Sequence, residues 1–100
     1  MSTTNRNKVY ITTNRNHTVL YVGSSSDLSS RIHKHKTKFY KGFTSKYNVD
    51  KLVYFESFPR ITEAHKRERQ VKKYRREKKE ALINAINPEW NELDPNSDGN

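Results

Sequence analysis

Two short stretches near the start of the chain constrain its fold more than any other feature. Residues 8–13 and 18–23 are rich in β-branched and aromatic side chains, a composition typical of β-strands. Residues 14–17 (NRNH) between them predict a turn, because asparagine tolerates left-handed backbone conformations. A connection this short joins antiparallel strands, whereas parallel strands need a long crossover. A hairpin at the start of the chain therefore argues against a doubly wound parallel sheet.

The middle of the chain predicts a helix, a loop and a third strand. The helix covers residues 24–36, where serine and aspartate at the start are suitable N-terminal caps. At helical spacing, one stripe of this segment carries Leu28, Arg31, Ile32 and His35. Residues 37–50 are loop-like, with Gly42 and scattered aromatic side chains. Residues 51–58 predict the third strand, which Pro59 ends.

Two further helices are expected after the third strand. Thr62 is a candidate N-cap for a helix that carries Glu68, and residues 80–86 predict a more apolar helix. Asn87 and Pro88 end that second helix, and Trp90 is expected to fold back on the core. The element order is then β-β-α-β-α-α. The predicted fold class is α/β of the α+β type, with a three-stranded, mainly antiparallel sheet flanked by helices.

The length and composition of the chain indicate one domain. Its 100 residues suffice for a modest core, and only 31% of them are hydrophobic. We expect a flexible N-terminus over residues 1–7, a single domain over 8–93 and a disordered tail over 94–100. The absence of cysteine excludes disulfides and thiolate metal sites. Without a secretory signal or an apolar run long enough to span a membrane, a cytoplasmic location with no membrane partner is expected.

Positive charge is the strongest indication of a partner. The net charge is +9, and residues 65–79 alone carry nine Lys or Arg side chains against two Glu. A solvated basic helix would explain this segment, but a basic chain as a whole favours a nucleic acid over that simpler reading. A membrane surface is disfavoured because the helix has no opposite face rich in Trp, Phe or Leu. The candidate phosphate contacts are Lys66, Arg67, Lys72, Lys73, Arg75 and Arg76.

Glu68 is unusual because it is an acid on the least polar face of this basic helix. An ion pair with Lys72, four residues later, would explain it but is worth only about 0.3–0.5 kcal/mol. Tyr10 and Tyr21 lie on adjacent predicted strands, and Arg31 and His35 lie one helical turn apart. Each of these side chains alone has a simpler explanation, such as core packing or a solvated cation. If the two helical stripes both cover the sheet, however, the side chains can converge on one site.

The combination resembles the GIY-YIG nuclease domain over roughly residues 7–93. The resemblance is carried by VYI at 9–11, YVG at 21–23, and then Arg31, His35 and Glu68. It is closest to the small stand-alone bacterial proteins of this family, through Gly42-Phe43-Thr44, Lys46-Tyr47, Asn87-Pro88 and Trp90. The chain departs from the family pattern at three positions. Lys8 stands where the first glycine of the motif is expected, and Val9 and Val22 replace isoleucines.

The resemblance implies an endonuclease that hydrolyses DNA phosphodiester bonds with one divalent metal ion, Mg²⁺ or Mn²⁺, and that serves DNA repair. It implies Glu68 as the only protein ligand of the metal and Tyr10 as the general base or as the group that orients the attacking water. Tyr21 would position the phosphate, Arg31 would stabilise charge in the transition state, and His35 would relay a proton or hold the phosphate. Gly23 and Asn87 would support the site.

Other functions stay open at this level. A non-catalytic DNA- or RNA-binding module that retains the nuclease fold fits Lys8 and the basic helix. A ribosome-associated role would place the positive charge on RNA. Duplex, branched and single-stranded DNA are all open as substrates, and RNA is not excluded. The oligomeric state is not determined by these patterns.

Overall fold

The structure is a computed structural model that describes residues 6–37 and 47–96. Strands β1 (Asn7–Thr13), β2 (Leu20–Ser25) and β3 (Lys51–Phe58) form an antiparallel sheet in the order β2-β1-β3. The helices are α1 (Leu28–Lys36), α3 (Ile61–Lys72) and α4 (Arg76–Ile86). The predicted sheet and the order β-β-α-β-α-α are therefore confirmed. The family segment at 42–46 lies outside the described residues.

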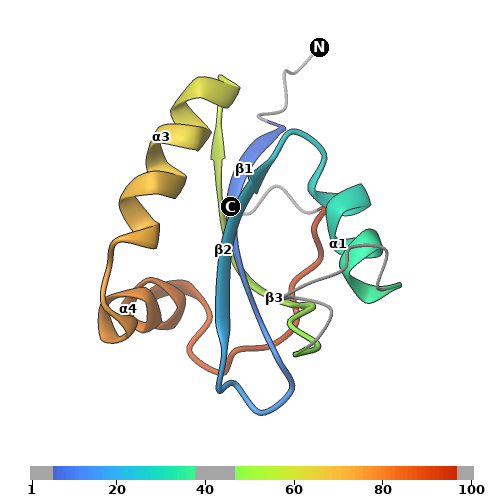
Figure 1. Ribbon diagram of the computed structural model, residues 1–100, viewed down its shortest axis with the longest axis vertical. Helices are drawn as coiled ribbons and strands as arrows, with labels where there is room; N and C mark the ends of the chain where they lie inside the picture. The colour runs from blue at the N-terminus through green and yellow to red at the C-terminus, as the bar shows by residue number, and fades with distance from the viewer. Residues whose placement is uncertain (1–5, 38–46, 97–100) are drawn as a thin grey trace.

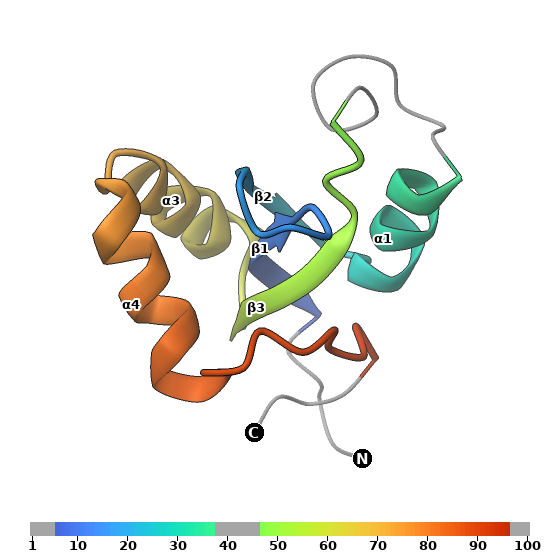
Figure 2. The same ribbon diagram turned by 90° about the horizontal axis from the view of Figure 1, so that it is seen from below.

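Helices cover both faces of the sheet. Figure 1 shows the sheet nearly edge-on, with α1 on one side and α3 and α4 on the other, and Figure 2 shows the same layers from below. On the α3 side, Val9 and Ile11 pack in a core with Val71 and Ile83. On the α1 side, a second core contains Tyr10, Leu28, Ile32, Leu52 and Phe55. Because successive strand residues point to opposite faces, the central strand β1 is buried at every position from Val9 to Thr13.

The turn between β1 and β2 depends on one asparagine side chain. Asn14 Oδ1 accepts hydrogen bonds from the backbone N–H groups of Thr18 at 2.8 Å and Val19 at 3.1 Å. The left-handed residue is His17, with φ of 59°, and its N–H donates to the carbonyl of Asn14 at 3.0 Å. The turn uses Thr18 and Val19, so β2 begins at Leu20 and not at residue 18 as predicted.

Helix α1 begins later than the sequence pattern suggested. Ser24 and Ser25 continue strand β2, and the N-cap is Asp27, whose carboxylate accepts from the N–H of Ser30 at 3.2 Å. The predicted apolar stripe is confirmed at three positions, since Leu28, Ile32 and His35 are all buried. Arg31 on the same stripe is half-buried.

The prediction that Thr62 caps α3 is wrong. Helix α3 begins at Ile61, its N-cap is Arg60, and no side chain caps it. Ile61 packs against the core of the α3 side, and Pro59 stops β3 just before it, so the helix begins as soon as the strand has ended. Helix α4 also begins before the expected residue 80. Its first residues, from Arg76 onward, are charged and mostly exposed, so they lack the apolar pattern from which the helix was predicted.

The segment after α4 covers the outer edge of β3. Asn87 ends α4 as predicted, and Trp90 folds back on the core with 9% of its surface exposed. The N–H of Leu93 donates to the carbonyl of Leu52 on β3 at 2.8 Å. Covering an edge strand hinders its pairing with a strand of another chain, so this segment protects the β3 edge from such association.

Described residues near both ends of the chain make contacts within the fold. Strand β1 begins at Asn7, one residue earlier than expected, and the Asn7 side chain donates to the carbonyl of Phe58 at 3.4 Å. Of the predicted tail, Asp94 accepts from the N–H of Asn96 at 2.9 Å, and residues 97–100 lie outside the described part, as do residues 1–5. In the described ranges, every helix is too short or too polar to cross a lipid bilayer.

Candidate active site

Three of the predicted site residues form a ring cluster between the hairpin and α1. Tyr10 on β1 lies 6.2 Å from Tyr21 on β2 and 6.2 Å from His35 on α1, measured between ring centroids. The Tyr21 and His35 rings are 5.7 Å apart. Tyr10 Oη and His35 Nε2 are within hydrogen-bonding distance at 3.3 Å, with the donor set by the histidine tautomer. The tertiary structure therefore brings these two tyrosines and the histidine together.

Gly23 makes room for the two phenol rings. It lies directly opposite Tyr10 in the hairpin register. A Cβ atom at Gly23 would lie 2.6 Å from Tyr10 Oη, closer than real Cβ atoms approach, and 3.0 Å from Tyr21 Cε2, a tight contact. The predicted supporting role of Gly23 thus has a steric reason, since any larger side chain would displace Tyr10.

His35 is held in its neutral form. Burial lowers the pKa of its imidazole below the ordinary value, and the nearby positive charge of Arg31 lowers it further. Asp50 acts in the opposite direction but does not outweigh these effects. A neutral imidazole can accept a proton, which is the property that the predicted proton relay needs.

Glu68 is half-buried on α3, and both of its oxygens are bound within the protein. The hydroxyl of Ser24 donates to Oε1, and Lys72 Nζ lies 2.7 Å from Oε2. Burial alone would raise the pKa of Glu68, but the bonds from Lys72 and Ser24 and the nearby His65 together lower it. Glu68 is therefore ionised at neutral pH.

Glu68 and the ring cluster lie on opposite faces of the sheet, next to consecutive residues of the edge strand β2. Convergence required that both helical stripes cover the sheet, and the structure shows that they cover it on different faces. Tyr10 packs over Gly23, whereas Glu68 is bonded to the next residue, Ser24. Because β2 is an edge strand in the described sheet, a ligand that lies along this edge can reach both groups.

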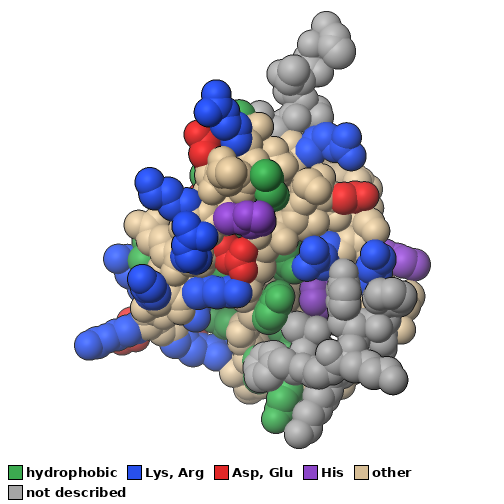
Figure 3. All heavy atoms as spheres, turned by 45° about the horizontal axis from the view of Figure 1, so that its top comes forward, with side chains coloured by type: hydrophobic (Ala, Val, Ile, Leu, Met, Phe, Trp, Pro, Cys, Tyr) green, Lys and Arg blue, Asp and Glu red, His purple; other side chains and the backbone are tan. Residues whose placement is uncertain are grey.

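The surface near this edge is strongly basic. Figure 3 shows one face of the molecule, on which an acidic side chain lies among Lys and Arg side chains on the side that α3 and α4 occupy in Figure 1. Among the six candidate phosphate contacts, Lys66, Lys73 and Arg75 have exposed side chains. Lys72 is exposed as well but is paired with Glu68. These four residues are accessible to a polyanion.

Two of the six candidates make contacts inside the fold that their sequence pattern did not indicate. Arg67 Nη2 lies 3.0 Å from Glu56 Oε2 on β3, and Arg67 Nη1 donates to Tyr74 Oη at 3.2 Å. Arg76 pairs with Glu80 at 2.7 Å and donates to the carbonyls of His17 and Thr18 at 2.6 and 2.7 Å. Their guanidinium groups link helices to the sheet and to the hairpin turn.

Asn87 lies at the other edge of the sheet. Its side-chain amide donates to the carbonyl of Val53 on β3 at 3.0 Å and to the carbonyl of Asn91 at 2.9 Å. Its own oxygen accepts from the N–H of Asn91 at 3.0 Å. These bonds attach the C-terminal segment to β3, two strands away from Ser24 and Glu68. Any support that Asn87 gives to the site therefore acts through the fold.

Sequence reasoning missed Ser24 as a partner of Glu68. The hydroxyl comes from a different strand, 44 residues earlier, and no local pattern joins the two. The Lys72 partner was visible as an i, i+4 pair, and its geometry is now defined. The link between Glu56 and Arg67 was also missed, because it depends on how α3 lies across β3.

The residues at the β2 edge fit a metal ion that takes few protein ligands. In the described part of the chain, no three His, Asp or Glu side chains gather in a way that could hold a metal. Glu68 is one ionised carboxylate, and oxygen is the ligand that Mg²⁺ and Mn²⁺ prefer. Mg²⁺ commonly binds one or two carboxylates and completes its shell with water and phosphate oxygens. A single-carboxylate site therefore fits once Lys72 releases Oε2.

Comparison with known proteins agrees with this geometry. Residues 6–81 match the family model described as the GIY-YIG catalytic domain. UPF0213 proteins of Staphylococcus aureus strains Mu3 and Mu50 are each 38% identical over 64 residues, which cover 64% of this chain and 78% of the relative. The solution NMR structure of a UPF0213 protein from Bacillus halodurans is 30% identical, with a TM-score of 0.54. That match covers 84% of this chain and 88% of the other.

Proposed function

Because the chain belongs to the GIY-YIG catalytic domain family, we propose that it is an endonuclease that hydrolyses DNA phosphodiester bonds with a divalent metal ion, in the service of DNA repair. The observation that carries this proposal is the arrangement at the β2 edge. An ionised carboxylate, Glu68, is bonded to Ser24, and the ring cluster of Tyr10, Tyr21 and His35 packs beside the adjacent Gly23. Carboxylate and proton-transfer groups are the two components that such hydrolysis needs.

Glu68 would hold the metal ion, Mg²⁺ or Mn²⁺. When bound, the ion would neutralise phosphate charge and favour ionisation of a bound water. Ser24 would fix the carboxylate by its bond to Oε1 and leave Oε2 as the oxygen that turns toward the ion. Lys72, now on Oε2, would then be free to contact a phosphate of the substrate.

Tyr10 and His35 would handle the proton of the attacking water. A phenol is mostly protonated at neutral pH, so it needs a neighbouring base before it can accept a proton. His35 Nε2 is 3.3 Å from Tyr10 Oη and is held neutral, so it can take the phenol proton as the phenol takes one from water. The proton then moves from water to Tyr10 and from Tyr10 to His35.

Arg31 and Tyr21 would act on the phosphate. Arg31 lies one helical turn before His35 on α1 and is half-buried, so its guanidinium can face the same side of the sheet. A planar guanidinium is suited to stabilising the charge that builds on phosphate oxygens. Tyr21 packs against both Tyr10 and His35 and would orient the scissile group.

A nuclease assay with matched variants tests the proposal. Wild-type protein should cleave at least one of duplex, branched or single-stranded DNA in Mg²⁺ or Mn²⁺, and not in excess chelator. Glu68→Gln should lower the rate by at least about 100-fold, because it removes the only charged metal ligand. Glu63→Gln, on an exposed position of the same helix, should cleave like the wild type. Equal rates for Glu68→Gln and wild type would contradict the proposed role.

A non-catalytic binding module is the second candidate, and one observation favours it. Both oxygens of Glu68 already have partners within the protein, so this carboxylate is satisfied without any metal. A binding module would bind DNA or RNA with an affinity that falls steeply with salt, by about 0.9 log units per log unit of salt for each duplex phosphate contacted. Binding without cleavage on any substrate would support this candidate.

A further inference from the structure

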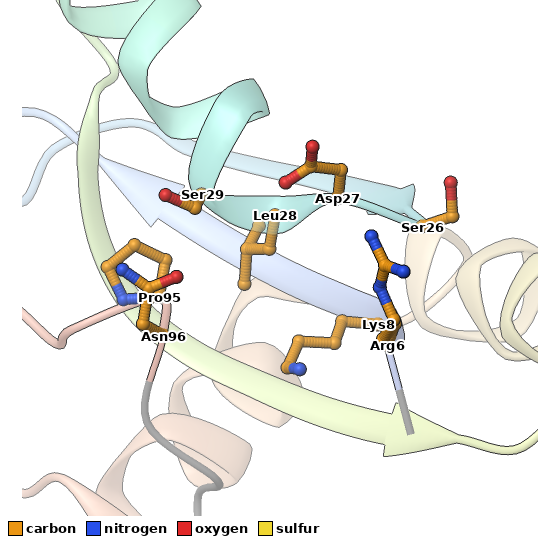
Figure 4. Close-up of a pocket in the computed structure, with 8 residues that line it drawn as sticks. All are labelled: Arg6, Lys8, Ser26, Asp27, Leu28, Ser29, Pro95 and Asn96. Carbon is orange, nitrogen blue, oxygen red and sulfur yellow. The ribbon is translucent and has the colours of Figure 1, made fainter. Parts of the chain in front are cut away.

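A polar pocket lies beside the candidate active site, and neither the ring cluster nor Glu68 contributes to it. The pocket has a volume of about 230 Å³ and lies between the start of β1, the loop before α1 and the C-terminal segment. Figure 4 shows Lys8 of β1 and Arg6, which directly precedes β1, on one side of it, with Ser26 and Asp27 of the loop and Pro95 of the C-terminal segment around them. Three parts of the chain that are distant in sequence therefore form its walls.

We propose that this pocket binds a backbone phosphate of a nucleic-acid strand, next to the phosphate that is cleaved. The inference rests on the proposed function, in that the substrate is a nucleic acid. It assigns to Lys8 and Arg6 a phosphate subsite outside the six basic residues of α3, α4 and their connection.

The charged groups of the pocket fit a phosphate. Among the described residues that line the pocket, Lys8 and Arg6 carry positive charge and Asp27 carries a carboxylate. The carboxylate of Asp27 is engaged as the N-cap of α1, where it accepts from the N–H of Ser30 at 3.2 Å. Ser26 adds a hydroxyl, which can donate to a phosphate oxygen. Arg can bind a phosphate through two parallel hydrogen bonds, whereas Lys acts as a point charge.

Lys8 has a defined position within this pocket. Its ammonium nitrogen lies 5.6 Å from the centroid of the Phe55 ring, and its stem runs beneath Leu28 in Figure 4. Arg6 extends toward the loop and also lines a second hollow with Asn7, Ser26 and Asp27. The side chains of Arg6 and Lys8, two residues apart in the sequence, therefore both line this opening.

The pocket lies in line with the candidate active site. Lys8 precedes Tyr10 by two residues, so both side chains point to the α1 face of β1, about 6.6 Å apart along the strand. In the hairpin register Lys8 is opposite Ser25, and Tyr10 is opposite Gly23. A strand whose scissile phosphate lies beside Tyr10 can therefore place a neighbouring phosphate near Lys8. Lys8 occupies the position of the first motif glycine, so this cation is added where the family pattern has no side chain.

The test compares charge-removing variants in a binding assay without metal. Lys8→Met keeps the stem on Phe55 and removes the charge, and Arg6→Gln removes the second charge. Lys78→Met is the control, because Lys78 lies on α4, on the other face of the sheet, 4.1 Å from the Tyr74 ring. The probe is a fluorescent oligonucleotide, duplex and single-stranded, titrated from low to high salt. Inorganic phosphate is titrated separately by NMR.

The expected result is a smaller salt dependence of binding in the pocket variants only. Lys8→Met should weaken binding several-fold and lower the slope of log affinity against log salt by about 0.9 for duplex or 0.7 for single strands. Arg6→Gln should act in the same direction, and Lys78→Met should leave the slope of the wild type. Thermal unfolding checks that each variant is folded, and if Lys8→Met is not, Lys8→Gln replaces it.

Three outcomes would overturn the proposal. They are a wild-type slope in both pocket variants, no nucleic-acid binding by the wild type, and a Lys8-dependent response to inorganic phosphate but not to the oligonucleotide. The last outcome would assign the pocket to a small free anion. Cleavage is measured in parallel, so that binding with a changed slope but no cleavage would reject only the nuclease function. Cleavage with an unchanged slope would reject only the subsite.

Discussion

At the scale of single residues, the carboxylate of Glu68 is controlled by two neighbours with different consequences. Ser24 donates a hydrogen bond to one oxygen, and Lys72 places a positive charge on the other. A hydroxyl can stay bonded while a carboxylate binds a metal ion, because it occupies only one oxygen. An ammonium group competes with a metal ion, because both are cations that seek the same oxygen. The two residues therefore lead to opposite predictions.

Ser24→Ala should reduce metal-dependent cleavage by about ten- to a hundredfold, the usual effect of losing a group that orients a metal ligand. The midpoint of urea unfolding should change little, because Ser24 is only half-buried. Ser24→Thr keeps the hydroxyl and should restore most of the activity. Cleavage rates at saturating Mg²⁺ measure the effect, and an active Ser24→Ala would show that Glu68 needs no such bond.

Lys72→Met should strengthen metal binding by the free protein. Removal of the ammonium group vacates Oε2 of Glu68 and raises the pKa of that carboxyl, which still stays ionised at neutral pH. We expect the Mn²⁺ dissociation constant, measured by calorimetry without DNA, to fall a few-fold, since an i, i+4 ion pair on a helix is worth about 0.5 kcal/mol. Lys66→Met on the same helix is the control, and equal constants for all three proteins would show that Lys72 does not compete.

At the scale of elements, the segment after α4 behaves as a clamp on β3. It crosses the outer edge of the sheet, with Trp90 in the core of the α3 side and Leu93 packed against the core of the α1 side. Asn87 starts this crossing, and its side chain makes three hydrogen bonds, of which one reaches β3 directly. The position of Asn87 in the family pattern is thus explained by the fold before any chemistry is considered.

Asn87→Ala should destabilise the protein by about 2–4 kcal/mol, because it leaves the buried carbonyl of Val53 without its partner and removes both side-chain bonds to the backbone of Asn91. Urea unfolding followed by circular dichroism measures the loss. The Mn²⁺ dissociation constant of the folded variant should match that of the wild type, since Glu68 lies at the opposite edge of the sheet. A stable Asn87→Ala protein with weakened metal binding would instead assign Asn87 to the site.

At the scale of the whole molecule, one sheet with helices on both faces explains how so small a chain forms a site. The described residues form a separate core on each face of the sheet. The C-terminal segment lies along the β3 edge, whereas Glu68 and the ring cluster contact consecutive residues, Ser24 and Gly23, of the β2 edge. The net charge of +9 would attract a polyanion to this edge.

The stability of the whole molecule should fall in two steps as pH is lowered. His35 has a depressed pKa when folded, so the unfolded chain takes up its proton first, and stability is lost from about pH 6.5 downward. Glu68 also has a depressed pKa, so its contribution is lost only below its ordinary value of 4.5. Urea unfolding should therefore give a smaller loss between pH 7.5 and 5.5 for His35→Gln than for wild type.

The control for the first step is His33→Gln, an exposed position on the same helix, which should follow the wild type over this range. Identical pH dependence in His35→Gln and wild type would mean that the burial of His35 beside Arg31 does not perturb its proton affinity.

Much of the fold could be predicted because it depends on patterns local to each segment. The hairpin, the order of elements and the buried stripe of α1 follow from alternation along strands, from helical spacing and from turn residues. The predicted ends of helices and strands were less accurate where other contacts overrode local signals. Ile61 begins α3 because it packs on the core, and Thr18 lies outside β2 because its N–H is bonded to Asn14 in the turn.

The sequence by itself determined the family, the residues proposed for the candidate site and the positive charge, since these depend on which residues are present and how they are spaced. Only the tertiary structure decided that α1 and α3 cover opposite faces, that Ser24 binds Glu68 and that Arg67 binds Glu56. Such pairs join residues on different elements, and no local periodicity encodes them. They form when the chain buries both faces of one sheet, which sets the partner that each half-buried charge can reach.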